Sequence, residues 1–345
     1  MNKKEKFSFR EYITKALNGM ALGLFSSLII GLILKQIGDY AGIEMLVKFG
    51  KIAQFMMGPA IGAGVAYSIG ASPLGVFASI ITGAIGAGTI ESNESLFMIK
   101  IGEPVGAFVA ALIGAEFSKL VSGKTKVDII IVPAGIIIIG GLAGAFVGPI
   151  MVTVMKGLGE VINRATELNP IPMGIIVAVI MGMILTLPIS SAALAISLGL
   201  SGLAAGAAAV GCATQMIGFA VSSYKENGVG GAIAQGLGTS MLQVPNIVRN
   251  PLIWIPPILA SAILGPIATY VLNMENNSIG AGMGTSGLVG QFGTIAVMSK
   301  TQPMTLVLGK IILLHFILPA VLTLIISEYM RKKGWIKPGD MRING

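Results

Sequence analysis

The run Gly238-Thr-Ser-Met-Leu-Gln-Val-Pro-Asn-Ile-Val-Arg-Asn-Pro251 is polar and broken by proline, in a chain that is otherwise mostly apolar. Hydrogen-bonding side chains are frequent in it, and Pro245 and Pro251 interrupt helical backbone. Non-helical backbone at membrane depth is stable only where protein or a water-filled cavity covers it, because hydrocarbon leaves its amide groups unpaired. We therefore predict a re-entrant hairpin that lines a site for a polar solute. The alternative is a long loop outside the membrane between two ordinary spans.

The overall composition places the chain among membrane proteins. Apolar residues make up 54% of it and charged residues 11%, whereas about 25% of the residues of a soluble domain are charged. Glycine accounts for 48 of 345 residues, about twice its usual share, and small residues allow transmembrane helices to pack closely. We expect an all-α integral membrane protein.

The net charge of +8 would suggest a nucleic-acid partner in a soluble protein. Here the basic residues lie at the ends of apolar segments, where they determine orientation in the membrane. One group precedes the first span and the other follows the last: Lys3, Lys4, Lys6, Arg10 and Lys15, then Arg331, Lys332, Lys333, Lys337 and Arg342. We therefore expect no nucleic-acid partner, a lipid environment, two cytoplasmic termini and an even number of spans.

These basic tails divide the chain into a cytoplasmic segment 1–15, a transmembrane domain 16–329 and a cytoplasmic segment 330–345. A basic region before an apolar one also begins a signal peptide. However, the apolar run here is long enough to span a membrane, and no small-residue cleavage site stands out after Ile33. We expect a retained first helix.

Ten spans of about 20 mostly apolar residues are expected. They lie at 16–34, twice in 52–90 with a break at Ala71-Ser-Pro73, up to 121, at 128–155, twice in 168–224, and at 252–272, 276–298 and 304–326. Residues 91–103 are expected to form a polar outside loop, and residues 156–168 an amphipathic interfacial helix. The glycine-rich segment 276–298 is either a broken helix or a second re-entrant element. An even number of spans favours the broken helix that crosses.

Ionisable residues within the membrane are candidate functional residues because burying them is costly. Arg249 in the hairpin either meets an anionic group or extends to the interface. Glu103 either lines the cavity or begins a span near water, and the second reading is favoured. His315 in the last span either binds solute or caps a neighbouring helix. Interhelical hydrogen bonds alone would explain most of the polar residues in apolar runs, which are Gln215, Gln235 and Gln291.

The sequence contains no obvious catalytic constellation. Cys212 is the only cysteine, which excludes an internal disulfide and a multi-cysteine metal site. The glycines from Gly280 to Gly290 resemble a phosphate-binding loop, but no lysine follows in the required register. We expect no enzyme activity from this chain alone, no metal and no cofactor.

Three stretches resemble a known family in their local sequence and in their order along the chain: Val127-Asp-Ile-Ile-Ile-Val-Pro-Ala-Gly135, Gly148-Pro-Ile150 and Arg249-Asn-Pro-Leu-Ile-Trp-Ile-Pro-Pro257. They resemble the IIC membrane component of the phosphoenolpyruvate-dependent sugar phosphotransferase system. The chain looks most like the fructose-type branch, and more specifically like a stand-alone IIC-like group that includes the perfringolysin O regulator. The resemblance covers most of residues 50–330.

This resemblance implies a homodimer, a substrate site within each protomer, and rigid-body movement of the substrate-binding part against a dimerising scaffold. Sugar-transporting relatives usually carry a glutamate next to proline in the hairpin. Gln243 stands in that neighbourhood here, and a neutral amide forms weaker hydrogen bonds than a carboxylate. Phosphotransfer would also need IIA and IIB domains, which we expect to be absent from this chain.

We therefore expect a permease of a bacterial cytoplasmic membrane that moves a small polar solute, with a neutral sugar slightly favoured over an anionic metabolite. The candidate binding residues are Thr239, Ser240, Gln243, Asn246, Arg249, Asn250, Gln291, His315 and Glu103. One alternative is a membrane-bound sensor or regulator that retains the permease fold and reports to a cytoplasmic partner. Another is a IIC subunit that works with separately encoded IIA and IIB proteins.

Overall fold

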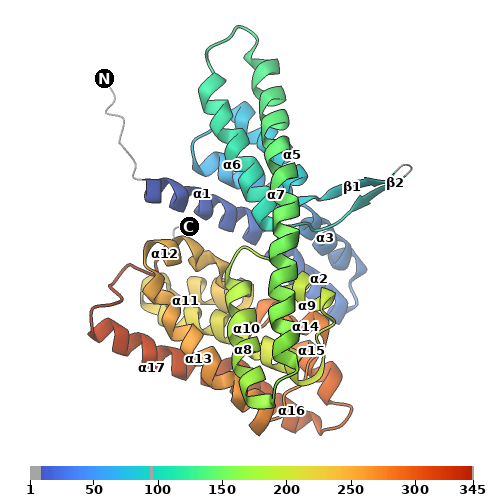
Figure 1. Ribbon diagram of the computed structural model, residues 1–345, viewed down its shortest axis with the longest axis vertical. Coiled ribbons are helices and arrows are strands. Elements are labelled where there is room, and N and C mark those ends of the chain that lie inside the picture. Colours follow the sequence, from blue (N-terminus) through green and yellow to red (C-terminus); the bar gives the residue numbers. More distant parts are fainter. Residues whose placement is uncertain (1–8, 94–95, 344–345) are drawn as a thin grey trace. The chain divides into compact units, whose positions relative to one another are not determined.

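A computed structural model describes residues 9–93 and 96–343 (Figure 1). Lys3, Lys4 and Lys6 of the predicted N-terminal tail lie outside these residues. In the part described, helices predominate and the strands form a single two-stranded sheet, so the all-α class is confirmed. The chain divides into two compact units, Met1–Met151 and Val152–Ile343.

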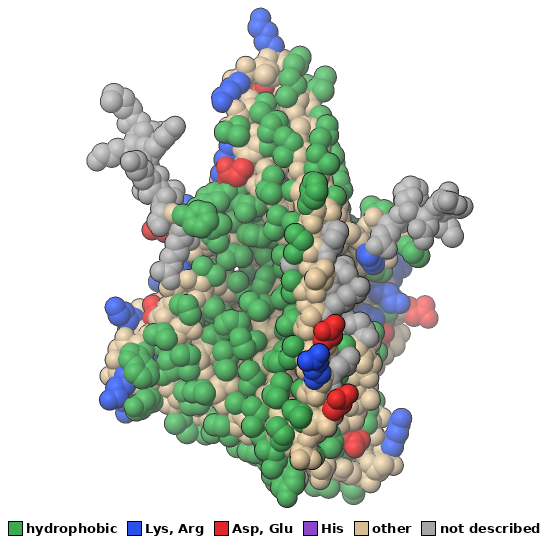
Figure 2. Space-filling view, in the orientation of Figure 1, with side chains coloured by type: hydrophobic (Ala, Val, Ile, Leu, Met, Phe, Trp, Pro, Cys, Tyr) green, Lys and Arg blue, Asp and Glu red, His purple; other side chains and the backbone are tan. Residues whose placement is uncertain are grey.

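Within the described ranges, six helices are long and apolar enough to cross a membrane. They are Glu11–Asp39, Pro104–Val121, Asp128–Val147, Gly202–Ser222, Pro251–Val271 and Met304–Lys332. Shorter apolar helices cover Pro73–Ala87, Pro170–Thr186 and Ser286–Met298. Hydrophobic side chains cover much of the face in Figure 2, as contact with lipid requires. The protein is thus a multi-pass membrane protein, and the number of ten spans stays a prediction.

The first unit contains a helical run of α1 (Phe9–Leu24), a π-helical turn and α2 (Ile30–Ala41). It is followed by α3 (Glu44–Phe55), α4 (Met57–Ser68), α5 (Pro73–Ala87) and α6 (Pro104–Val121). The predicted break at residues 71–73 is confirmed. Ser72 caps α5 by accepting a hydrogen bond from the Gly75 amide (3.2 Å), and Pro73 occupies the first turn of that helix, where its missing N–H costs nothing.

The segment 91–103 is more ordered than the expected loop. Strands β1 (Ile90–Asn93) and β2 (Leu96–Ile99) pair antiparallel, with Ile90 opposite Ile99. Charged and polar residues in β1 obscured this hairpin in the sequence. A pair of strands needs only backbone hydrogen bonds and a short connection.

Helix α7 (Asp128–Thr166) is continuous over 39 residues, so the prediction of a separate interfacial helix at 156–168 was wrong (Figure 1). Charges such as Glu160 and Arg164 change the solvation of a helix without breaking its backbone, and both are exposed. On the other side of this stretch, Ile162 and Ala165 are buried. At 1.5 Å per residue the helix is about 58 Å long, which exceeds the hydrocarbon thickness of roughly 30 Å.

The second unit is built around α10 (Gly202–Ser222), which is buried along most of its length. Helices α8 (Pro170–Thr186), α13 (Ile255–Pro266) and α17 (Leu318–Lys332) pack against it. An alanine-rich helix without charges is apolar on every side, which suits a central position. The remaining helices of this unit are α9 (Ser191–Ser197), α11 (Tyr224–Ile233), α12 (Val244–Arg249), α14 (Ser278–Ala281), α15 (Val289–Met298) and α16 (Met304–Ile311).

Glycine permits backbone contact between these helices. A Cβ added to Gly265 of α13 would lie 2.1 Å from the carbonyl oxygen of Gly174 in α8, and one added to Gly174 would lie 2.7 Å from the oxygen of Gly265. In α10, a Cβ on Gly211 would lie 2.0 Å from the Ala178 oxygen. The helices of this unit therefore meet at backbone distance, and no larger residue fits at these positions.

Replacement of Gly265 by alanine is expected to separate α8 from α13 and to destabilise the protein by about 1–3 kcal/mol, the usual cost of overpacking. Thermal unfolding of the purified protein in detergent measures this effect. Gly157→Ala is the matched control, because Gly157 of α7 is exposed and an added Cβ there meets nothing within 4 Å. Equal midpoints for the two variants would show that the contact between α8 and α13 does not limit stability.

Candidate functional site

The predicted hairpin has the irregular backbone that its sequence indicates. Helix α11 is kinked at Gly228 (φ 62°), a π-helical turn covers Ala234–Gly238, and Thr239 is extended. A 3₁₀ turn, Ser240–Gln243, then leads into α12, and a second one, Pro251–Trp254, precedes α13. Thr239 and Asn250 each accept a hydrogen bond from the amide two residues ahead, on Met241 (3.1 Å) and Leu252 (3.2 Å). These side chains thus pair backbone groups that the helix breaks leave free.

Protein covers the hairpin. Residues 238–247 are all buried, including Ser240 and Gln243, whose exposed fraction is 0%. Because the backbone here changes within ten residues from a π-helical to a 3₁₀ turn and then to α12, polar groups at the breaks need partners within the protein. This burial is the condition under which a re-entrant segment is stable.

A chain of amide side chains runs through the buried part of the hairpin. Gln235 Nε2 donates to Ser223 Oγ (2.9 Å) and to the Gly231 carbonyl (3.0 Å), while its Oε1 accepts from Gln243 Nε2 (2.8 Å). Gln243 Oε1 in turn accepts from Asn246 Nδ2 (2.8 Å). Gln235 was not among the predicted site residues, and hydrogen bonding within the protein, which the sequence analysis favoured for most such glutamines, is what the structure shows for it.

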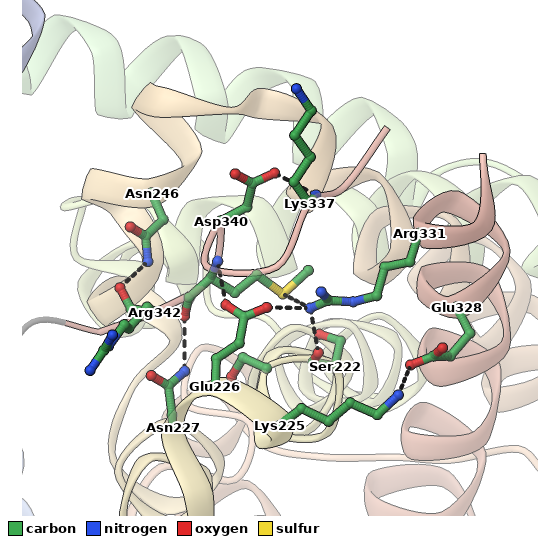
Figure 3. Close-up of polar contacts among 12 residues, drawn as sticks. Ser222, Lys225, Glu226, Asn227, Asn246, Glu328, Arg331, Lys337, Asp340 and Arg342 are labelled. Atoms are coloured by element: carbon green, nitrogen blue, oxygen red, sulfur yellow. Dashed lines mark hydrogen bonds and ion pairs between the residues drawn. The ribbon is translucent and has the colours of Figure 1, made fainter. Parts of the chain in front are cut away.

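The amides also reach the C-terminal segment. Gln243 Nε2 donates to the Met341 carbonyl (2.9 Å), and Asn246 Nδ2 donates to the Arg342 carbonyl (3.0 Å), as Figure 3 shows for Asn246. An amide nitrogen carries two hydrogens. In Gln243 and Asn246 both hydrogens are therefore in use.

A second polar cluster lies where the hairpin meets α8 and α10. Thr186 Oγ1 and Ser240 Oγ are 2.9 Å apart, and Thr186 also lies 3.3 Å from Gln215 Oε1. The same Gln215 oxygen accepts from the indole Nε1 of Trp254 (2.9 Å). Gln215 is fully buried, and within residues 9–93 and 96–343 its Nε2 has no hydrogen-bond partner.

The backbone of the glycine-rich segment is broken between α14 and α15, and whether the segment crosses the membrane or re-enters stays a prediction. Gly284, Gly287 and Leu288 have φ values of 52°, 52° and 60°, and α15 starts immediately afterwards. This left-handed conformation is unusual for leucine. The segment also contacts the hairpin, because Thr285 Oγ1 donates to the Gly236 carbonyl. The two broken segments that we expected to form one site are thus held together.

Gln291 and His315 form a buried pair beside this break. With the Gln291 amide oriented so that its oxygen faces the ring, Oε1 accepts from His315 Nδ1 (2.8 Å). Its nitrogen then donates to the carbonyls of Leu288 (3.2 Å) and Gly284 (3.3 Å). This assignment leaves His315 Nε2 as an acceptor, and among the described residues it has no partner.

The remaining predicted site residues lie apart from these clusters. Arg249 is exposed in the last turn of α12. Asn250 Nδ2 donates to Asp340 Oδ2 (2.7 Å) and to the Trp335 carbonyl (3.2 Å). Glu103 belongs to the first unit, where it is the N-cap residue of α6.

Three residues of the second cluster were not predicted as site residues: Thr186, Gln215 and Trp254. Gln215 was visible as an amide in a charge-free helix, and Trp254 follows the hairpin within Arg249-Asn-Pro-Leu-Ile-Trp254. Among the described residues, no group of three His, Cys, Asp or Glu side chains is arranged to hold a metal ion. The buried clusters consist of hydroxyl, amide, indole and imidazole groups, which are donors and acceptors of the kind that pair with hydroxyl groups.

A comparison with protein families identifies one match that covers nearly the whole chain. The family described as "Phosphotransferase system, EIIC" matches residues 14–343. No curated protein and no solved structure matches the chain.

Replacement of Gln235 by leucine is expected to destabilise the protein by about 1–3 kcal/mol, because it leaves a buried N–H of Gln243 and the hydroxyl of Ser223 without this partner. Lys225→Ala is the control. This substitution also removes a hydrogen bond, the one from Lys225 to Glu328 (2.8 Å). That bond lies at the surface, where such pairs contribute at most about 1 kcal/mol. Thermal unfolding in detergent compares the two. An equal loss of thermal stability in both variants would mean that the buried amide hydrogen bonds contribute no more than the exposed ion pair does.

Proposed function

The chain belongs to the EIIC family of the phosphotransferase system, and we propose that it is a permease that moves a small, sugar-like solute by an elevator-type change. The family supports a membrane-embedded sugar permease component. The hairpin and the glycine-rich segment would form the substrate site. A homodimer in a bacterial cytoplasmic membrane, with both termini cytoplasmic, completes the proposal.

The observation that carries this proposal is the joining of two broken helical segments by buried neutral polar side chains. Thr285 connects the segments, and Ser240 with Gln215 provides hydroxyl and amide groups next to the hairpin. Broken helices expose backbone amides and carbonyls that helices otherwise use internally, and transporter sites use such helix ends. Burying these polar groups is costly unless a ligand or the protein itself forms hydrogen bonds with them.

The chemistry of the side chains favours a neutral solute. Gln215 Nε2 is a donor and His315 Nε2 an acceptor, and in the part of the chain that the structure describes neither atom has a partner. A sugar hydroxyl both donates and accepts, so it can pair with either atom. The indole of Trp254, held by Gln215 Oε1 (2.9 Å), adds an aromatic surface next to these polar groups.

A sensor or regulator with the same fold is the second candidate. It is favoured by the saturation of Gln243, whose donors are occupied by the protein's own atoms. A protein that reports occupancy to a cytoplasmic partner does not need to release solute on the other side. Cooperation with separately encoded IIA and IIB proteins remains a further form of the permease proposal.

A panel of sugars, sugar phosphates and small organic acids is expected to contain a neutral sugar that raises the thermal stability of the detergent-purified protein. Binding to the folded state stabilises it by about 2.7 kcal/mol at a ligand concentration one hundred times Kd. Gln243→Ala should reduce this shift, because it removes a side chain that is predicted to bind the sugar. Arg249→Ala should leave it unchanged, because Arg249 is exposed.

Uptake of the stabilising sugar into vesicles that contain the protein then separates the two candidates. Net uptake supports the permease, whereas binding without uptake supports the regulator. A shift with anions alone, lost in Arg249→Ala, would exclude a neutral sugar as the substrate. The absence of any shift across the panel would count against the permease.

A further inference from the structure

The segment after α17 folds back onto the hairpin, and we call residues 333–343 the C-terminal strap. Turns at Gly334 (φ 74°) and Gly339 (φ 92°) reverse its direction. Inside the strap, Asp340 Oδ2 accepts from the Lys337 amide (2.8 Å) and the Arg342 amide donates to the Gly339 carbonyl (3.2 Å). The strap thus has a defined conformation.

The backbone of the strap is bound by α11, the helix that precedes the hairpin (Figure 3). Asn227 Nδ2 donates to the Met341 carbonyl (2.9 Å), and Asn227 Oδ1 accepts from the Ile343 amide (2.8 Å). Glu226 Oε2 accepts from the Met341 amide (2.8 Å). These contacts recognise peptide groups rather than particular side chains, as one strand recognises another.

The same stretch of the strap is also hydrogen-bonded to side chains that were predicted to bind the solute. The Met341 carbonyl accepts from Gln243 Nε2 (2.9 Å), and the Arg342 carbonyl accepts from Asn246 Nδ2 (3.0 Å). Asn250 Nδ2 donates to Asp340 Oδ2 (2.7 Å). The strap therefore presents oxygen atoms to three amides of the hairpin, where a solute would present hydroxyl oxygens.

Two apolar side chains anchor the strap. Ile336 and Met341 are 1% and 0% exposed, and they pack in a cluster with Phe219, Ile247 and Ile253. By contrast, Lys337, Pro338, Gly339 and Arg342 are exposed. Two buried apolar side chains and the hydrogen bonds described above hold the strap, and such a segment detaches locally at lower free energy than the whole protein unfolds.

A mostly buried ion pair between α11 and α17 also contacts the strap. Arg331 donates to Glu226 Oε1 (2.8 Å), with exposed fractions of 14% and 9% for the two side chains, while the other oxygen of Glu226 accepts from the strap (Figure 3). Arg331 also donates to the Ser222 carbonyl at the end of α10 (3.0 Å). The strap, α11 and α17 thus meet at one carboxylate, and Arg331 links it to the end of α10. A movement of α11, which leads into the hairpin, therefore disturbs all of these contacts.

We propose that the hairpin amides form a docking site for peptide backbone, that the chain's own C-terminal strap is its occupant, and that the docked strap restrains the hairpin and competes with solute. Both amide hydrogens of Gln243 are in use while the strap is docked. A solute that needs this donor displaces either the Gln235 oxygen, within the hairpin's own amide chain, or the Met341 carbonyl of the strap. The competition with solute rests on the permease proposal, whereas the restraint of the hairpin does not.

Hydrogen–deuterium exchange of the detergent-purified protein tests the restraint without any ligand. Asn227→Ala removes two contacts to the strap backbone and leaves the apolar cluster and Gln243 intact. Met341→Ser removes an apolar anchor and provides a second, independent variant. Arg342→Ala is the matched control, since only its backbone carbonyl contacts the hairpin amides and its side chain is exposed.

Both test variants are expected to speed exchange about tenfold in residues 333–343 and also in residues 239–247, because each loses contacts that hold the strap in place, and a tenfold change corresponds to about 1.4 kcal/mol. The control should match the parent. Faster exchange in the strap with unchanged exchange in the hairpin would overturn the restraint.

Titration with D-fructose as the probe, followed by thermal stability, tests the competition. Release of the strap should lower the apparent Kd about tenfold in Asn227→Ala, because a larger fraction of the protein is competent to bind. An unchanged Kd would overturn the competition. Absence of any D-fructose shift, in the parent and in both variants, would count against the proposed sugar function, while the exchange data would still decide the restraint.

Discussion

Backbone contact between helices, made possible by glycine, is the constraint on which the second unit depends. A Cβ on Gly211 of α10 would lie 2.0 Å from the Ala178 oxygen, and one on Gly206 would lie 1.9 Å from the Met274 oxygen. In lipid, where apolar surfaces gain little by leaving the solvent, close packing of this kind replaces the hydrophobic effect. Only α11 and a π-helical turn separate the hairpin from α10, so the position of α10 helps to determine where the hairpin side chains lie.

Pairing of buried polar groups is the second constraint, and it explains the composition of the site. Most of the buried hairpin is neither α-helix nor sheet, so side chains and distant backbone supply the missing partners. Gln235, Gln243 and Asn246 pair with one another, and the strap carbonyls accept the remaining hydrogens of Gln243 and Asn246. Neutral amides suit this arrangement because they donate and accept without the desolvation cost of a charge. The same property suits them to exchange a carbonyl oxygen for a hydroxyl.

Local features of the sequence predicted much of the architecture. Pro245 and Pro251 indicated the broken hairpin, and Ser72-Pro73 indicated the start of a helix. Charge was a poorer guide, since Glu160 and Arg164 suggested a helix boundary within the continuous α7. Of the candidate site residues, the structure joins Gln243 to Asn246 and Gln291 to His315, whereas Arg249 is exposed and Glu103 lies in the other unit. Thr186 and Trp254 escaped prediction because each is unremarkable until Gln215 brings them together.

The sequence by itself determined the membrane class, the position of the helix breaks and, through short motifs, the family resemblance. The hydropathy of a segment determines whether it lies in lipid or in water, and proline and glycine determine the backbone conformation at their own positions. Both effects are local. Only the tertiary structure decided which partner each buried amide takes. Gln243 donates to the carbonyl of Met341, 98 residues away, and a backbone carbonyl leaves no trace in the side-chain pattern of a sequence. The occupant of the hairpin was therefore invisible until the chain was folded.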